Sequence, residues 1–255
     1  MSSFFSKKLL AFLLLFLSGS SISWAVSPQE SFEQANQFYT SRNFPEAIKL
    51  YESLEAQGIQ SGDLFYNLAN SYYRQGEMGE AVFYYLKALR YAPRDRDLVA
   101  NYHYVLSKRA EGYEKRLSER AMDLFFFLKD LVTLREMLWL ALASYWLLFT
   151  AGMLYYLKRK AQWRIAFFIL IALNFYILPT AFLKFYDEHL QKTAVVVVPQ
   201  LNVYSEPNEE AVRLFELREG AITQVKDDKE GFVKIQYRNG QTGWVKASEM
   251  KVLSS

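Results

Sequence analysis

Cysteine is absent from this 255-residue chain, histidine occurs only twice, and neither sign of charge is in large excess. Without cysteine the protein can have no disulfide, no thiolate metal ligand, no thiol nucleophile and no lipid attached through an amino-terminal cysteine. A formal net charge of +3 is too small to indicate a nucleic-acid partner, and the basic residues form no long cluster beyond a short run near residue 158. Nucleic-acid binding and thiol chemistry are therefore excluded.

The sequence patterns of catalysis are also missing. His103 and His189 are far apart, and neither has a spaced acid or a second histidine that would complete a metal site. The chain has no glycine loop that would bind phosphate and no serine elbow. Asp227, Asp228 and Glu230 resemble a carboxylate pair, but they stand between two predicted strands, where a solvated turn is the better interpretation. We therefore predict no catalytic residue, no metal site, no cofactor and no enzymatic activity.

Apolar residues make up 51% of the chain and aromatic residues 17%, and they are concentrated in separate segments. Residues 1–25 have the three parts of a secretory signal, namely Lys7-Lys8, an apolar run over Leu9–Leu17, and the small-residue exit Ser23-Trp24-Ala25. This apolar run is too short to cross a bilayer. We therefore predict a signal peptide cleaved after Ala25, and an uncleaved anchor extending through Ile22 is the alternative.

Two longer apolar runs are predicted to cross a membrane. Met137–Leu157 and Ile165–Leu183 contain no charge and would be about 31 Å and about 28 Å long as helices. The loop between them, residues 158–164, carries four cations and no acid, so the positive-inside rule places it in the cytoplasm. The amino-terminal and carboxy-terminal parts of the chain are then both expected on the opposite side of the membrane.

Polar residues within or beside these spans have competing interpretations. Asn174 and Pro179 interrupt the second span, but with only two spans and no intramembrane carboxylate we favour a hydrogen bond to the neighbouring helix over a transport role. The run Leu124–Leu128 is too short to cross, and we predict that residues 120–136 form an interfacial helix on the outer face. Packing of this run against the preceding domain is the alternative.

Residues 62–95 spell one 34-residue helix-turn-helix unit that resembles a tetratricopeptide repeat. Small residues at Ala69, Ala81 and Ala88 allow two antiparallel helices to approach closely. A weaker copy lies 34 residues upstream, and the two copies align at five positions. We predict a repeat domain over residues 28–119, with repeats over about 28–61 and 62–95 and a capping helix over 97–118. The pattern positions of the stronger copy are Phe65, Leu68, Ala69, Tyr72, Gly76, Ala81, Tyr85, Ala88 and Pro93.

One helical face of these repeats is a candidate peptide-binding groove. Tyr66, Asn70 and Tyr73 form a stripe at helical spacing, opposite the packing residues. Resemblance to peptide-binding tetratricopeptide proteins implies that asparagines here hydrogen-bond the backbone of an extended partner, and amides suit this because they both donate and accept. The alternative for Asn67 and Asn101 is that they bridge adjacent helices. The predicted site comprises Asn36, Tyr39, Tyr66, Asn67, Asn70, Tyr73 and Asn101.

Residues 193–253 change to short extended runs broken by turn residues, and five short strands predict a small barrel. The segment resembles a bacterial SH3-like domain through Asn202-Val203-Tyr204, Glu219-Gly220 and Gly243-Trp244-Val245. It departs from that family at Tyr204, where arginine is common. Tyr204, Tyr237 and Trp244 are predicted to form an aromatic groove for an extended peptide or a cell-wall strand, and a core position is the alternative for Trp244.

The fold class is thus multi-domain, with all-α tetratricopeptide repeats, a two-helix transmembrane hairpin and a small all-β SH3-like barrel. This order resembles the BatE type of the bacterial aerotolerance (Bat) family. The resemblance implies an inner-membrane protein with both terminal domains in the periplasm. Its implied partners are von Willebrand A-type Bat membrane proteins and a MoxR-type ATPase system, in stress tolerance or envelope assembly. We favour a scaffold function, with peptidoglycan binding through the barrel and a periplasmic sensor as alternatives.

Overall fold

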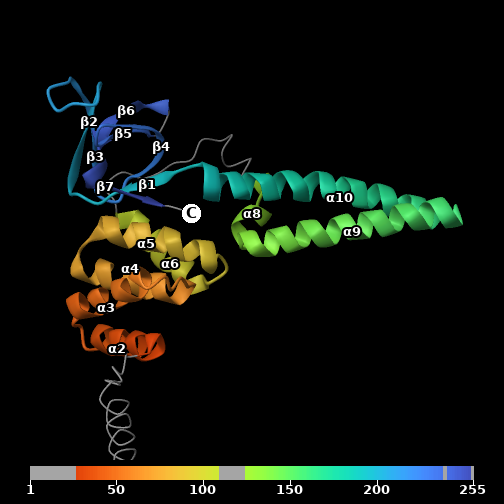
Figure 1. Cartoon of the computed structure of the whole chain (residues 1–255), viewed down its shortest axis with the longest axis horizontal. Helices are drawn as coiled ribbons and strands as arrows, with labels where there is room; N and C mark the ends of the chain where they lie inside the picture. The colour runs from red at the N-terminus through yellow and green to blue at the C-terminus, as the bar shows by residue number, and fades with distance from the viewer. Residues whose placement is uncertain (1–26, 109–123, 238–239, 254–255) are drawn as a thin grey trace, which may run out of the picture.

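The computed structural model describes residues 27–108, 124–237 and 240–253, and its amino-terminal part is a stack of helices (Figure 1). The predicted signal peptide and residues 109–118 of the predicted capping helix lie outside the described residues. The stack contains α2 (Pro28–Thr40), α3 (Phe44–Ala56), α4 (Gly62–Gln75), α5 (Met78–Tyr91) and α6 (Arg96–Lys108).

Capping residues set the ends of the stacked helices. Ser27 and Glu30 form a reciprocal capping box at the start of α2, with hydrogen bonds of 2.9 and 3.1 Å. The hydroxyl of Ser61 accepts a hydrogen bond from the backbone of Leu64 and caps α4. Gly76 ends α4 in the left-handed conformation, with φ of 96°. The helix boundaries therefore follow from local side-chain chemistry.

Small residues and large rings share the core of the stack. Alanines of α2, α3, α4 and α5 have no exposed surface, which allows the helix backbones to approach closely. Phe65, Tyr51 and Tyr85 fill the space between them and are at most 1% exposed. The buried alanines are Ala35, Ala47, Ala69, Ala81 and Ala88.

Two long apolar helices, α9 (Leu134–Lys158) and α10 (Ala161–Phe185), form an antiparallel hairpin that projects from the rest of the molecule (Figure 1). Both are long and apolar enough to cross a membrane. They extend past the predicted runs at each end, and α10 continues into a π-helical turn over Tyr186–Leu190. Because the hairpin returns the chain to its starting end, the helical stack and the barrel lie at the same end of it.

A polar clasp joins the hairpin near its middle. Ser144 and Asn174 are both buried, and the Ser144 hydroxyl donates to Asn174 Oδ1 at 3.1 Å. Asn174 Nδ2 in turn donates to the Ser144 carbonyl at 3.3 Å and to the Leu170 carbonyl at 2.9 Å. Asn174 therefore bonds to the neighbouring helix, as the sequence interpretation favoured.

The predicted interfacial helix over 120–136 is corrected by the structure. Within its described part, the regular helix α8 covers only Leu128–Leu131, and the chain is extended at Val132 and Thr133. Thr133 and Glu136 form a capping box that starts α9. This cap forces a new helix to begin at Leu134, so the segment cannot be one continuous helix.

The carboxy-terminal part is an antiparallel sheet of seven strands with the order β3-β2-β6-β5-β4-β1-β7. Alternating residues of the strands enclose a small core that includes Leu201, Val203, Ile235 and Val245. The sequence predicted five strands and missed β3, whose side chains are mostly exposed, and β7, which has only four residues. The strands are β1 (Thr193–Val196), β2 (Gln200–Tyr204), β3 (Arg213–Arg218), β4 (Ile222–Lys229), β5 (Phe232–Gln236), β6 (Thr242–Lys246) and β7 (Met250–Leu253).

Asn174→Leu tests the hairpin clasp, because leucine has a similar volume but forms no hydrogen bond to Ser144. We expect the substitution to lower the free energy of unfolding by about 0.5 to 2 kcal/mol, the usual contribution of a hydrogen bond between two helices in a membrane. The measurement is the unfolding midpoint of the full chain in mixed micelles as the fraction of SDS rises. Thr150→Val is the control, since the Thr150 hydroxyl donates within its own helix to Leu147 at 2.9 Å. Equal losses in the two variants would contradict an interhelical role.

Candidate functional site

A hydrogen-bonded set of three polar side chains occurs twice in the stack, with a spacing of 34 residues. In the first set, Asn36 Oδ1 accepts from the Tyr51 hydroxyl at 2.6 Å and from Asn67 Nδ2 at 3.0 Å. Asn36 lies on α2, Tyr51 on α3 and Asn67 on α4, so the set joins three consecutive helices.

The second set repeats this arrangement one unit later. Asn70 Oδ1 accepts from the Tyr85 hydroxyl at 2.5 Å and from Asn101 Nδ2 at 3.3 Å. Asn101 Nδ2 also donates to the Tyr66 hydroxyl at 2.8 Å. Burial raises the pKa of Tyr85, so this phenol stays protonated and remains a donor near neutral pH. Burial raises the pKa of the equivalent phenol of the first set in the same way.

These contacts separate the predicted groove asparagines into two kinds. Asn67 and Asn101 bridge adjacent helices, which is the alternative that the sequence left open for them. Asn36 and Asn70 instead accept hydrogen bonds from within the stack through their side-chain Oδ1 atoms. Within the described part of the chain, no hydrogen bond donated by Asn36 Nδ2 is present, whereas the Asn70 amide also lies within hydrogen-bonding reach of the Tyr66 hydroxyl. Because an amide nitrogen carries two N–H groups, each of these asparagines keeps at least one donor for a ligand.

Tyrosine rings accompany these donors on the same helices. Tyr39 packs edge-on against Phe44, with ring centroids 5.6 Å apart, and Tyr73 packs edge-on against Tyr104 at 5.9 Å. Tyr39 and Tyr73 are half-buried, whereas Tyr104 is 50% exposed. Sequence reasoning did not select Tyr104, which lies on α6 at the position equivalent to Asn70 of the preceding repeat. We call Asn36, Tyr39, Asn70 and Tyr73 the Asn/Tyr face.

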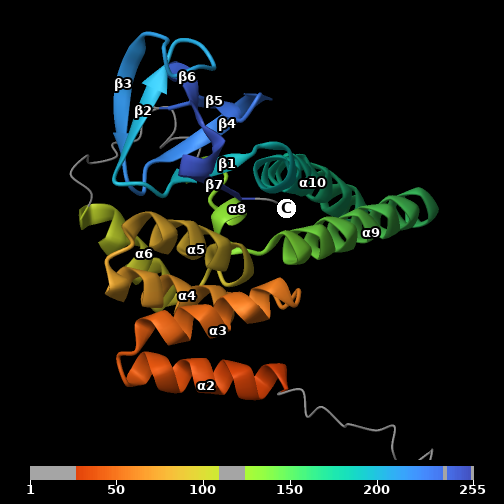
Figure 2. The same cartoon turned by 60° about the vertical axis from the view of Figure 1, so that its left-hand side comes forward.

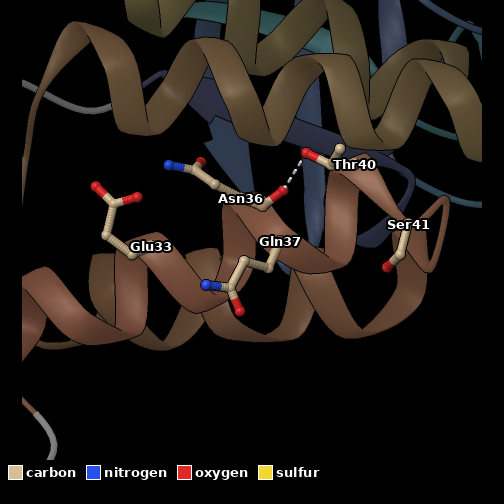
Figure 3. A pocket seen from close by; sticks show the side chains of 5 residues that line it. All are labelled: Glu33, Asn36, Gln37, Thr40 and Ser41. Atoms are coloured by element: carbon tan, nitrogen blue, oxygen red, sulfur yellow. Dashed lines mark hydrogen bonds between the residues drawn. The ribbon is translucent and has the colours of Figure 1, made fainter.

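An open hollow of about 490 Å³ lies beside the first of these donors. Figure 3 shows its lining along α2, where the Thr40 hydroxyl donates to the backbone carbonyl of Asn36 at 2.8 Å. The hollow is lined by residues of polar types. They are Glu33, Asn36, Gln37, Thr40 and Ser41.

The barrel carries a second candidate surface on its outward face. Tyr204 pairs with Trp244 across β2 and β6, and Trp244 pairs with Lys234 across β6 and β5. Directly paired residues of neighbouring strands point to the same face. Trp244 is half-buried, and Lys234 Nζ lies 5.8 Å from its ring centroid. We call Tyr204, Lys234 and Trp244 the outer row.

The predicted grouping of Tyr237 with Tyr204 and Trp244 is corrected by the strand alternation. Side chains two positions apart along a strand point to the same face, so Tyr237 shares a face with Ile235, which is fully buried. Tyr237 accordingly packs against the barrel core. A Cβ atom at Gly243 would lie 2.4 Å from Val203 Cγ1, so only glycine allows β2 to approach β6 closely there. The outer row therefore consists of two rings and a lysine, with Tyr237 on the other face.

The helical stack and the barrel are packed against each other, which sequence reasoning did not predict. Helix α5 lies against β1 and β7 (Figure 2), and Val195 and Leu253 of these strands belong to the same buried cluster as the repeat core. Gly79 N donates to Glu219 Oε1 at 2.7 Å, and a Cβ atom on Gly79 would lie 2.4 Å from the Val196 carbonyl. The two modules thus approach too closely for any side chain at this position.

An ion pair stands beside this contact. Lys251 Nζ lies 2.6 Å from Glu80 Oε2 and 5.2 Å from the ring centroid of Tyr84. Burial raises the pKa of Glu80, while Lys251 partly opposes that rise. Lysine therefore supplies the charge that an otherwise poorly solvated carboxylate needs.

Comparison with known families identifies both soluble modules. Residues 62–95 match the tetratricopeptide repeat model, and residues 199–251 match the bacterial SH3 domain model. No curated protein matches the chain. The matches confirm the tetratricopeptide and SH3-like parts of the predicted fold class, and both kinds of domain are typically non-catalytic interaction modules. No group of three or more histidine, aspartate or glutamate side chains placed to hold a metal ion occurs among residues 27–108, 124–237 and 240–253.

Lys251→Met should destabilise the protein by about 1 to 3 kcal/mol at neutral pH, because it leaves the carboxylate of Glu80 without its partner. Glu80→Gln should cost less, since a partly exposed lysine can turn to water. Melting temperatures of the full chain in detergent measure both effects. Lys226→Met is the control, because Lys226 is exposed and should change stability by at most about 0.5 kcal/mol.

The loss in Lys251→Met should depend on pH in a defined direction. A carboxyl group with a raised pKa in the folded state binds its proton more tightly there, so lowering the pH through that pKa favours folding. Protonated Glu80 no longer requires a cation, so the stability lost in Lys251→Met should become smaller between pH 7 and pH 5. A deficit that is independent of pH would contradict this role for the ion pair.

Proposed function

We propose that the protein is a non-enzymatic scaffold of the bacterial inner membrane that holds partner proteins at the periplasmic face. The observation that carries this proposal is the packing of two binding-type modules against each other at one end of an apolar hairpin. A chain built in this way presents two ligand surfaces from one anchored body. In this proposal the repeat domain covers residues 28–119 and the barrel domain covers residues 193–253.

The proposed orientation is supported by the charges at the opposite end of the hairpin. Lys158, Arg159, Lys160 and Arg164 lie in or next to the turn between α9 and α10, which contains no acidic residue. Loops of this kind remain on the cytoplasmic side of the membrane. The modules at the other end of the hairpin are then in the periplasm, where the predicted signal peptide would deliver the amino-terminal domain.

The proposed ligand of the repeat domain is an extended peptide of a partner protein. The remaining N–H groups of the Asn36 and Asn70 amides can donate to backbone carbonyls spaced along such a peptide. Tyr39 and Tyr73 supply ring surface beside them. Asn67, Asn101 and Tyr66 support these residues through the contacts between helices. The Asn/Tyr face is the proposed peptide-binding site.

The module order resembles the BatE type of the Bat family, and this resemblance suggests the partners. We propose von Willebrand A-type Bat membrane proteins as direct partners, linked to a MoxR-type ATPase system, in stress tolerance or envelope assembly. Both soluble modules are of kinds that bind proteins, which supports an adaptor in such a complex.

Peptidoglycan is a second candidate ligand, and the outer row favours it. Tyr204 and Trp244 are directly paired rings on the outward face of the barrel, with Lys234 beside them. Half-buried rings of this kind can stack against sugar or peptide units of a cell-wall strand. This function would leave the Asn/Tyr face without a direct role.

Asn70→Asp distinguishes ligand binding from helix packing. A carboxylate can still accept from Tyr85 and Asn101, but it cannot donate to a peptide carbonyl. We therefore expect an intact fold and a loss of partner affinity of roughly tenfold or more. The measurement is the yield of partner adducts after cross-linking in native membranes, followed by mass spectrometry.

Asn208→Asp is the matched control, because it makes the same chemical change at an exposed turn of the barrel. Equal adduct yields from wild type and Asn70→Asp would exclude the Asn/Tyr face as the contact surface. If the full chain also sedimented with purified peptidoglycan, and Trp244→Ala abolished this, the second candidate function would be supported instead.

Reporter fusions test the proposed orientation. Alkaline phosphatase joined to the carboxyl terminus should be active, because this enzyme folds in the oxidising periplasm. Green fluorescent protein at the same position should stay dark after export through the general secretory route, whereas a fusion within residues 158–164 should fluoresce. The reverse pattern would place both modules in the cytoplasm and refute a periplasmic scaffold.

A further inference from the structure

Large apolar side chains stand exposed in the short segment that precedes the hairpin. Leu124 is 78% exposed, Phe125 is 61% exposed and Phe127 is 54% exposed, and Leu131 on α8 is 44% exposed. Contiguous apolar surface of this kind on a soluble protein usually marks a contact with another molecule or with a membrane.

Contacts with α10 show how far this segment reaches along the hairpin. The Tyr176 hydroxyl donates to the Phe125 carbonyl at 3.0 Å, and the Phe126 ring stacks on Tyr176 with an interplanar angle of 9°. Tyr176 lies eight residues before Lys184 in α10, which corresponds to about 12 Å along the helix axis. The segment therefore lies along the side of the hairpin and not beyond its end.

Charged groups gather at the other end of the same segment. Lys129 Nζ lies 2.6 Å from Asp187, and Lys184 Nζ donates to the Lys129 carbonyl at 2.8 Å. Lys184 also lies 3.0 Å from Glu188. These charges are at the level where α10 ends, whereas Phe125 and Phe126 are at the level of Tyr176. Along the hairpin axis, the side chains of the segment therefore change from apolar rings at Phe125 and Phe126 to a charged group at Lys129.

We propose that Leu124–Leu131 inserts into the outer leaflet of the membrane beside α10, with lipid acyl chains covering its exposed apolar side chains. This proposal rests on the proposed membrane-spanning hairpin. Half of a hydrocarbon core is about 15 Å thick, so a segment that reaches about 12 Å below Lys184 stays within a single leaflet. Phe125 and Phe126 pack on Tyr176 of α10, and the adjacent Phe175 of that helix is 83% exposed. Continuity with a lipid-facing surface favours acyl chains over a protein partner as the occupant.

Insertion would also orient the helical stack relative to the membrane plane. Arg94, which follows α5, lies 2.6 Å from Glu136 in the first turn of α9. The stack is therefore bonded to the hairpin just beyond the inserted segment. A hairpin alone can rotate about its own long axis, whereas an element inserted on one side of it resists this rotation.

Site-directed spin labelling of the full chain tests the insertion, and the absence of native cysteine makes single labels possible. The labelled variants are Leu124→Cys and Phe127→Cys, reconstituted in phosphatidylcholine and phosphatidylglycerol vesicles. Phe175→Cys is the control for the hairpin surface, and Val212→Cys, at a position that is 71% exposed on the barrel, is the control for water. The measured quantity is the collision rate of each nitroxide with oxygen, which enters lipid, and with a polar nickel chelate, which does not.

Both test positions should give a ratio of oxygen to nickel collisions several-fold above that at Val212 and close to that at Phe175. Nickel access like that at Val212, with Phe175 in lipid, would overturn the insertion and leave the spanning hairpin intact. Protection from both reagents would mean that protein covers the segment, which also overturns the proposal. Nickel access at Phe175 as well would refute the membrane hairpin and, with it, both the scaffold and the insertion.

Discussion

The antiparallel pairing of α9 and α10 is the constraint on which the arrangement of the other parts depends. Apolar helices of 25 residues each carry the chain away from the soluble modules and back to the same end. Polar groups in an apolar environment need internal partners, and the Ser144–Asn174 clasp satisfies this need while fixing the two helices against each other. Because the chain returns to its starting level, the helical stack and the barrel can meet, although the hydrogen-bonded Gly79 and Glu219 are 140 residues apart in sequence.

Their contact extends the core of the stack into the barrel. Val195 and Leu253 are buried against the repeat helices, and burial of such side chains stabilises by about 1.5 to 3 kcal/mol each. Two and a half repeats form a short solenoid that gains little from stacking alone. The barrel covers α5 and supplies apolar surface that a further repeat would otherwise supply. Folding of the stack is therefore coupled to folding of the barrel.

Local patterns in the sequence predicted much of this structure. The alanines at 34-residue spacing predicted the helix pairs, and the uncharged runs predicted the hairpin, because both depend on residues close in sequence. Alternation from Val233 through Ile235 could also have placed Tyr237 on the core side. The contact between modules could not be predicted in this way. Gly79 resembles any glycine near a helix start, and its role depends on a strand 117 residues later.

The candidate site shows the same limit. Asparagines spaced by 34 residues identified a candidate face of the stack, but they did not reveal which amide groups are already bonded. That distinction depends on Tyr51 and Tyr85, which were identified only as packing residues. Their hydroxyls bind the inward oxygens of Asn36 and Asn70 and so leave the opposite side of each amide for a ligand.

The lack of space at Gly79 has a consequence for avidity. A side chain cannot enter between α5 and β1, so the barrel and the stack are held in one orientation by direct contact and not by a flexible linker. A partner with two binding segments would then meet both modules at an effective concentration set by this fixed geometry. Only a partner whose segments match the spacing could engage both at once, and the rigid contact would select partners by their span.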